Sequence, residues 1–353
     1  METSVLIVGG GLTGLAVATA LHRAHRPFLL LEARERWGGR IHRAQIDGAS
    51  FDLGPAWFWP HQPRMRALAD RFGLTVFEQF AAGADLFEDA AGQLHRNAGY
   101  ASMAGSLRVD GGFAALVDAM VSTLPSGCLR LQHAVQALEP TQRGSRARVS
   151  APEGPITIEA EHVVIAAPPR LVAHASVADA VTTPAQREAM AAIPTWMAGH
   201  AKVVAVYDHA PWREAGLCGD VLSQRGPLVE IHDASPRDMR SFALFGFVGA
   251  PAGQRGTPGA LLDAARDQLA RTFGPAAGLP KTMRLHDWSA EPWTATPRDA
   301  VMLRHHPAYG LPAALRELGG GRVHLASTET ASAHGGFLEG SLEAAAAVVD
   351  QLL

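Results

Sequence analysis

"VLIVGGGLTGLAVATAL", residues 5–21, decides the fold of this 353-residue chain. An apolar run of strand length leads into glycines in G-x-G-x-x-G register, and a helical apolar stripe follows. In that pattern the first glycine makes a tight turn, the second lets backbone approach a pyrophosphate, and the third lets helix and strand pack closely. The glycines are Gly9, Gly11 and Gly14. We therefore predict a βαβ unit whose helix N-terminus faces the phosphates of a dinucleotide.

An acidic residue closes the second predicted strand, "PFLLLEA" at 27–33. Glu32 stands at the distance from the glycines where a carboxylate accepts hydrogen bonds from the ribose hydroxyls of an adenosine. Both strands are continuously apolar, which is typical of a parallel sheet covered on both faces. Strand, glycine turn, helix and acid together indicate a nucleotide site rather than a purely structural turn.

A second pair of glycines, in "RWGGR" at 36–40, decides between NAD and FAD. Two glycines and two arginines so near the ribose acid predict a second length of bare backbone beside a pyrophosphate. An NAD site has no need of a second cradle, so the spacing favours FAD.

Composition limits the other possibilities. The length and a 47% hydrophobic content suit two domains with large cores. A net charge of −3 predicts no binding of nucleic acid or of an anionic membrane, and no apolar stretch is long enough for a membrane span. The amino end does not look like a secretory signal, which predicts a cytoplasmic protein and leaves Tat-type export with a partner open. Cys128 and Cys218 lack metal-type spacing and are expected to be reduced.

With these motifs and those that follow them, the chain resembles the flavin-containing amine oxidases, the family of monoamine oxidases, polyamine oxidases and L-amino acid oxidases. The matching stretches run in the family's order over the whole chain: 5–21, "LLLEARERWGGR" (29–40), "FDLGPAW" (51–57), "GGFAALVDAM" (111–120), "VVIAAPP" (163–169), "AKVVAVY" (201–207), "HDWSAEPWTATP" (286–297) and "VHLASTETASAHGGFLEGSLEAA" (323–345). The first two are shared with phytoene desaturases, protoporphyrinogen oxidases and renalase.

The resemblance implies an α/β fold with two domains. The first is a Rossmann-like FAD-binding domain of the GR2 type, similar to p-hydroxybenzoate hydroxylase, and is expected at 1–60, 105–175 and 318–353. The second is an α+β substrate-binding domain built from insertions, expected at 61–104 and 176–317.

The resemblance also implies a set of FAD-binding residues. Gly9, Gly11, Gly14 and Glu32 would hold the AMP half, with Gly38 and Gly39 under the phosphates. Glu329 and the start of the last helix, near Leu338, would approach the ribityl chain and the flavin pyrimidine. The remaining expected contacts are Ala33, Arg34, Arg40, Gly54 and Val135, of which Arg34 and Arg40 would lie along the ribose and pyrophosphate and Val135 beside the adenine.

Lys202 is one of only two lysines, the other being Lys281. Strand alternation places Lys202 with Val204 and Val206 on one face. From the residues alone, a snorkelling lysine at a solvated strand edge is an equal alternative. In the family such a lysine holds a water against flavin N5, so the resemblance implies a catalytic Lys202 that assists the reaction with O2.

Aromatic residues in the matched motifs are the candidates for the substrate cavity. Phe337 and Trp288 are expected to be catalytic, with Phe337 standing where many relatives have Tyr. The second cage position falls near Pro297 and Arg298, so the usual pair of aromatic side chains is absent. The cysteine that bonds FAD in some relatives is also missing, which predicts non-covalent FAD. The further cavity candidates are Trp57, Phe58, Trp59 and Trp293.

Two histidine motifs remain open. His232–Asp233, in "VEIHDAS", is either an oriented imidazole at the substrate or a surface or core pair. His305–His306 has no third ligand at metal spacing, so we expect no metal.

Together these features predict an FAD-dependent oxidase of an amine or related C–N compound. Hydride transfer to flavin N5 and reoxidation by O2 would give hydrogen peroxide, and the substrate would be a small molecule or a carrier-bound compound. The alternatives are a renalase-like dihydropyridine oxidase, a dehydrogenase or desaturase with another acceptor, and a non-catalytic FAD-binding subunit. A homodimer is left open.

Overall fold

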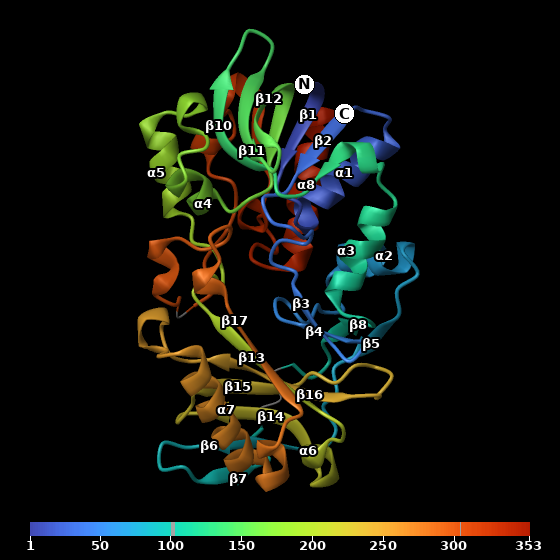
Figure 1. The fold of residues 1–353 in the computed structure, drawn as a ribbon, viewed down its shortest axis with the longest axis vertical. Helices are drawn as coiled ribbons and strands as arrows, with labels where there is room; N and C mark the ends of the chain where they lie inside the picture. The colour runs from blue at the N-terminus through green and yellow to red at the C-terminus, as the bar shows by residue number, and fades with distance from the viewer. Residues whose placement is uncertain (100–102, 304) are drawn as a thin grey trace.

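The computed structural model describes residues 1–99, 103–303 and 305–353. The chain forms two large sheets, one above the other, with both termini beside the first sheet (Figure 1). Residues 100–102, inside the predicted substrate-domain segment 61–104, and Arg304, inside the segment 176–317, lie outside the described residues.

The first sheet contains the predicted βαβ unit. Its central strands are parallel, and β10, β11 and the first half of β12 form an antiparallel extension. The strand order is β10 (Ala134–Pro140), β11 (Ser145–Ala151), β12 (Gly154–Ile165), β1 (Glu2–Val8), β2 (Phe28–Leu31) and β9 (Leu129–Arg130), and β18 (Val323–Leu325) pairs with β12.

Alternate side chains of β1 enter two different cores. Val5 and Ile7 pack under α1 (Leu12–Arg23) and α8 (Leu338–Leu352), whereas Leu6 packs on the opposite face. This two-sided burial explains the continuous apolar run in the sequence. The remaining helices near this sheet are α2 (Pro63–Arg71), α3 (Phe113–Ser122), α4 (Pro169–His174) and α5 (Pro184–Ala192). Of these, α2 packs on α8, and α5 packs in the core of the first sheet; both helices lie within the segments 61–104 and 176–317 that are expected to form the substrate domain.

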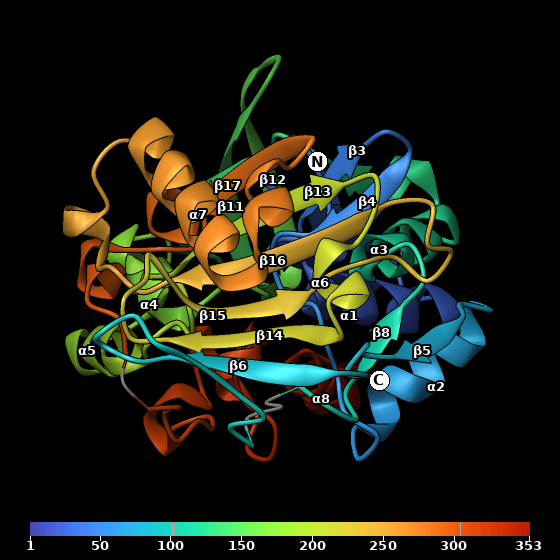
Figure 2. The same cartoon turned by 90° about the horizontal axis from the view of Figure 1, so that it is seen from below.

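The second sheet is mostly antiparallel. Figure 2, the view from below, shows its strands side by side. Its order is β17 (Thr282–Asp287), β13 (Ala201–Tyr207), β16 (Phe242–Val248), β15 (Leu228–Asp233), β14 (Leu217–Ser223), β6 (Ala84–Glu88) and β7 (Leu94–Arg96). Helix α7 (Pro258–Phe273) covers its outer face, and α6 (Pro211–Glu214) lies at one end. The other face, which carries Val204 and Val206, packs on Leu53 and Ala56 of the first part of the chain.

Two small hairpin-like pairs complete the fold: β3 (Arg43–Ile46) with β4 (Ala49–Asp52), and β5 (Val76–Glu78) with β8 (Leu107–Val109). Within the described ranges no helix combines the length and the apolarity that crossing a bilayer requires.

Candidate active site

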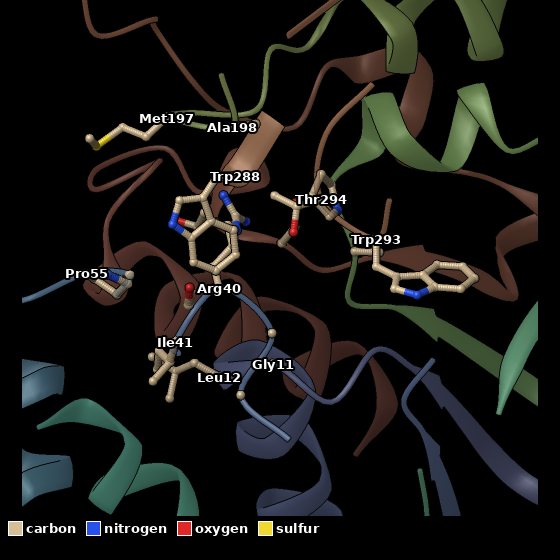
Figure 3. Close-up of a pocket in the computed structure, with 18 of the residues that line it drawn as sticks. Gly11, Leu12, Arg40, Ile41, Pro55, Met197, Ala198, Trp288, Trp293 and Thr294 are labelled. Carbon is tan, nitrogen blue, oxygen red and sulfur yellow. The ribbon is translucent and has the colours of Figure 1, made fainter. Parts of the chain in front are cut away.

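A cavity of about 590 Å³ separates the two sheets. Its wall includes backbone of both glycine motifs, the inner face of the second sheet and the start of α8. In Figure 3, Trp288 lies among the labelled lining residues, with Gly11, Leu12 and Ile41 below it, and Trp293 lies apart from it on the right. The cavity therefore joins the predicted nucleotide site to the predicted substrate site.

The two glycine motifs meet through their backbones. The Gly38 N–H donates to the Gly10 carbonyl at 2.8 Å, and Gly11 and Gly38 form a parallel bridge. A Cβ on Gly39 would lie 3.2 Å from the Gly11 Cα, and Gly38 has a φ of +104°. A side chain at Gly39 would push the two loops apart, and one at Gly38 would meet the Ile41 carbonyl in a strained backbone conformation, so the sequence needs glycine at both positions.

The third motif glycine has a packing role. A Cβ on Gly14 would lie 1.9 Å from the Gly9 carbonyl oxygen, so only glycine lets α1 start so close to β1. Gly14 lies behind the cavity wall, while Gly9 and Gly11 form part of it.

Glu32 is buried in the wall beside the first cradle. Its carboxylate accepts hydrogen bonds from the Gly10 N–H at 2.8 Å and from the Arg34 N–H at 2.9 Å. These two bonds fix the carboxylate, which has further lone pairs to accept ribose hydroxyls. Ala33 and Val135 line the same end of the cavity.

Both predicted arginines line the cavity, and both are held by carboxylates. Arg40 donates to Glu329 at 2.6 and 3.1 Å, and Glu329 is fully buried behind it. Burial alone would lower the pKa of the Arg40 guanidinium, but the carboxylate of Glu329 raises this pKa above its ordinary value. Arg34 binds Glu291 at 3.0 Å and the Thr294 hydroxyl at 2.8 Å. Glu329 therefore reaches the cavity through Arg40 and not with its own carboxylate.

These features fit FAD. Two bare-backbone loops suit a pyrophosphate, a fixed carboxylate suits an adenosine ribose, and the start of α8, at Leu338, lines the opposite part of the cavity and suits the negative charge of a reduced flavin.

Lys202 is buried in the wall, with 2% of its surface exposed. β13 is paired on both sides, so the alternative of a solvated strand edge is wrong. Lys202 Nζ donates to the Gly54 carbonyl at 3.1 Å and lies 3.7 Å from the ring centre of Phe245. Burial lowers the pKa of the ammonium to about 7, against the opposing effect of Asp52. The group can therefore change its protonation state near neutral pH.

The aromatic candidates separate into three groups. Trp288 is buried, lines the cavity and donates to the Leu53 carbonyl at 3.1 Å. Trp59 and Phe337 line the cavity together, with ring centres 5.7 Å apart. Trp57 also lines it, whereas the half-exposed Trp293 lies beside Thr294, next to the ribose-side Arg34.

The expectation for Phe58 is wrong. Its side chain is fully buried in the first core, 6.2 Å from the Phe113 ring, because its backbone is bridged to Leu107 and turns the ring away from the cavity.

Two aromatic side chains that the motifs do not mark pack beside Phe337, while the expected second cage position is outside the cavity. Pro297 and Arg298 lie outside the cavity wall, and Arg298 bonds the Ala191 carbonyl. His306 stacks on Phe337 at 5.0 Å and an interplanar angle of 14°, and Trp196 lies 4.8 Å beyond it in the wall. Sequence motifs gave no signal for Trp196, because it lies in an irregular loop.

His232 and Asp233 are not a pair. His232 faces the cavity side and bonds Asp220 and Glu230, at 2.8 and 2.7 Å. Asp233 points the other way and accepts from Trp212 and Arg213, both at 2.8 Å. Strand alternation explains the separation, since neighbouring residues face opposite sides.

Fold and site together define a flavin-dependent oxidoreductase. A sequence model described as flavin-containing amine oxidoreductase matches residues 12–96 and 76–353. The chain therefore belongs to the flavin-containing amine oxidoreductase family, and FAD is its cofactor.

Curated relatives and solved structures agree with this assignment. The chain is 23% identical to a probable flavin-containing monoamine oxidase A of Dictyostelium discoideum, over 96% of this chain and 95% of the relative. Putrescine oxidase bound to putrescine superimposes with a TM-score of 0.81 at 21% identity, covering 100% of this chain and 99% of that one. Cyclohexylamine oxidase from Brevibacterium oxydans gives 0.80 at 20% identity, with both chains fully covered. These neighbours confirm the predicted fold class.

Proposed function

We propose that this protein is an amine oxidase that uses O2 and releases hydrogen peroxide. The observation that carries the proposal is Lys202, a buried ammonium in the wall of a cavity that also contains the double glycine cradle. Burying an ammonium lowers the stability of the fold, so a lysine at this position is better explained by a function than by packing.

Bound FAD would accept a hydride equivalent from the amine carbon and pass the electrons to O2. Lys202 would act beside the flavin as a positioned proton donor. One N–H is directed to the Gly54 carbonyl, and an ammonium has two more to direct at a water or at O2. A pKa near 7 lets the group give up a proton and regain it in each cycle.

The aromatic wall would orient the amine and exclude water. Trp59, Phe337 and Trp288 present apolar ring surface to the cavity, and His306 supports Phe337 from behind. An apolar site favours the neutral amine, which is the form that can lose a hydride equivalent.

The cysteines support non-covalent FAD and a reducing, cytoplasmic compartment. Both are free thiols; Cys218 is buried in the second sheet, Cys128 lies next to β9, and both are outside the cavity wall. We expect acid or heat denaturation to release intact FAD into the supernatant. The homodimer stays a prediction.

Anaerobic addition of an amine panel to the yellow, FAD-loaded protein tests the proposal. An amine substrate should bleach the flavin absorbance, and admitting air should restore it with one equivalent of hydrogen peroxide. Bleaching without reoxidation by air would point to a dehydrogenase, and no bleaching with any amine would contradict amine oxidation.

A further inference from the structure

A buried carboxylate, Asp52, lies on the segment that binds the Lys202 ammonium. Asp52 is the last residue of β4, with 7% of its surface exposed, and it lies outside the cavity wall. The carbonyl that accepts from Lys202 Nζ belongs to Gly54, two residues further along the chain. The ammonium is therefore bound by the same short segment that carries the carboxylate.

The start of α3 fixes this carboxylate. Asp52 Oδ1 accepts a hydrogen bond from the Phe113 N–H at 3.1 Å, at the first residue of the helix. A Cβ on Gly112 would lie 2.8 Å from the same oxygen, so glycine lets the carboxylate approach the helix N-terminus. The partial positive charge at a helix N-terminus favours an ionised carboxylate. The carboxylate is thus held in one position by a hydrogen bond and by close packing.

Arg108, on β8, is a second buried cation in this region. Its guanidinium, with 7% of the residue exposed, donates to the carbonyls of Ser235 and Ala234 at 2.8 and 3.0 Å. Arginine keeps its charge at every pH at which the protein is folded. Arg108 therefore attracts Asp52 and repels the Lys202 ammonium.

The other charged or titratable groups that face this pair are paired or neutral. Arg43, opposite Asp52 on β3, forms an ion pair with Asp118 at 2.6 Å. His286 lies opposite Lys202 on β17, and burial lowers its pKa, so its ring is neutral at neutral pH. Among the residues that the structure describes, Asp52 is the anion whose charge acts on Lys202.

Burial and charge oppose each other in this pair. Burial lowers the pKa of the Lys202 ammonium to about 7, and the charge of Asp52 counteracts this fall. Burial raises the pKa of the Asp52 carboxyl to about 6, so this group is mostly ionised at neutral pH. Without Asp52, burial and Arg108 would both favour the neutral amine of Lys202.

We propose that Asp52 is a positioning residue that keeps Lys202 protonated at neutral pH for the reaction with O2. A fixed positive charge stabilises the negative charge that develops on oxygen. The two electrons and two protons that convert O2 to hydrogen peroxide come from the oxidised amine through the flavin, so Lys202 ends the reaction with its proton. The proposal rests on the proposed oxidase function and adds the group that sets its pH range.

NMR of the lysine side chains tests the effect of Asp52 directly, because the chain has only two lysines. FAD-loaded protein that contains lysine labelled with carbon-13 at Cε gives two signals, which Lys281→Met assigns. Asp52→Asn should lower the midpoint of the Lys202 titration by about one pH unit or more. The asparagine carbonyl can still accept from the Phe113 N–H, so the contact with α3 is kept while the charge is lost.

Asp47→Asn is the matched control. Asp47 lies 2.8 Å from Lys281 on the surface, so the same change there should leave the Lys202 midpoint unmoved. Arg108→Gln tests the same charges with the opposite sign: loss of a like charge should raise the Lys202 midpoint, even if Asp52→Asn does not fold. FAD content and melting temperature show which variants are folded.

Stopped-flow reoxidation of the reduced protein by O2, over the same pH range, connects the titration to the reaction. In Asp52→Asn the pH above which the rate falls should move down with the Lys202 midpoint, and the rate should recover below it. A defect of structure alone would lower the rate at every pH and would contradict the proposal.

The outcomes separate the positioning role from the proposed function. A Lys202 midpoint that is unchanged in Asp52→Asn, or in Arg108→Gln where only that variant folds, would overturn the role of Asp52 while the oxidase function stands. A midpoint that moves without the rate profile would overturn the use of the Lys202 charge in the reaction with O2. Failure of O2 to reoxidise the wild-type flavin would overturn the oxidase function itself.

Discussion

At the scale of the residue, the proposed reaction with O2 depends on Lys202. It lies on a strand paired on both sides, donates to the Gly54 carbonyl and lies over the Phe245 ring. Arginine could not replace it, because a guanidinium is larger and stays charged. The proposed role would therefore account for a lysine here in a chain that has only one other.

Lys202→Met should slow reoxidation of the reduced flavin by O2 by about 100-fold, as expected for loss of a positioned donor in a water-excluded site. Stopped-flow mixing of reduced protein with aerated buffer measures this rate. Lys281→Met is the control, since Lys281 is exposed and paired with Asp47 and Asp208. A reoxidation rate that is the same in Lys202→Met and wild type would exclude the oxidase role and favour a dehydrogenase.

Lys202 also predicts how stability depends on pH. Burial lowers the pKa of its ammonium from 10.5 to about 7. Between these pH values the unfolded chain holds a proton that the folded chain has lost, so the free energy of unfolding rises with pH. Below pH 7 the group is charged in both states and the effect ends.

Urea unfolding of wild type and Lys202→Met, both saturated with FAD, measures this dependence. From pH 7 to 10 the difference in unfolding free energy should move in favour of the wild type, by about 1 kcal/mol or more. A difference that stays constant over this range would mean that the ammonium is solvated.

At the scale of the element, we predict that FAD binding depends on the double glycine cradle. Gly39→Ala places a methyl group against Gly11 in a residue with φ of +58°. We expect FAD to bind about tenfold more weakly or worse, measured by fluorescence titration of the apoprotein. Gly48→Ala is the control, since Gly48 has φ of +79° but open space around it. Equal losses in both variants would show that backbone strain, and not the cradle, is responsible.

Elements defined by short-range patterns were predicted well from the sequence. The strand–turn–helix of residues 5–21 is confirmed, and so is the final helix, because glycine spacing and apolar periodicity are local signals. Within the motif at 111–120, the helix begins only at Phe113. Gly111 and Gly112 have φ of +79° and +76°, so the chain turns there before it becomes helical.

Sequence motifs mark only part of the candidate site. Strand alternation in "PLVEIHD" (227–233) places Glu230 and His232 on one face. Asp220 lies on another strand, and no sequence pattern predicts its contact with His232. The stack of His306 on Phe337 joins two loops in the same way. Such contacts depend on how distant segments pack together. The periodicity of a single sequence indicates local helices and strands and does not predict these contacts.

At the scale of the whole molecule, the cavity lies between two sheets, and both contribute to its wall. The two sheets lie one above the other in Figure 1. The first supplies the cradle and Glu32, and the second supplies Lys202 and Glu230. Trp288, which follows β17, reaches back to bond Leu53 and joins the two parts. The molecule can therefore hold the cofactor on one sheet and orient the substrate with the other.

A crystal structure of the FAD-loaded protein would show directly where the cofactor lies. We expect the adenosine between Glu32 and Val135, the pyrophosphate at the double cradle, and the flavin N5 facing Lys202 within reach of one bridging water. Electron density that places the flavin ring away from Lys202, or the pyrophosphate away from Gly11 and Gly39, would contradict it.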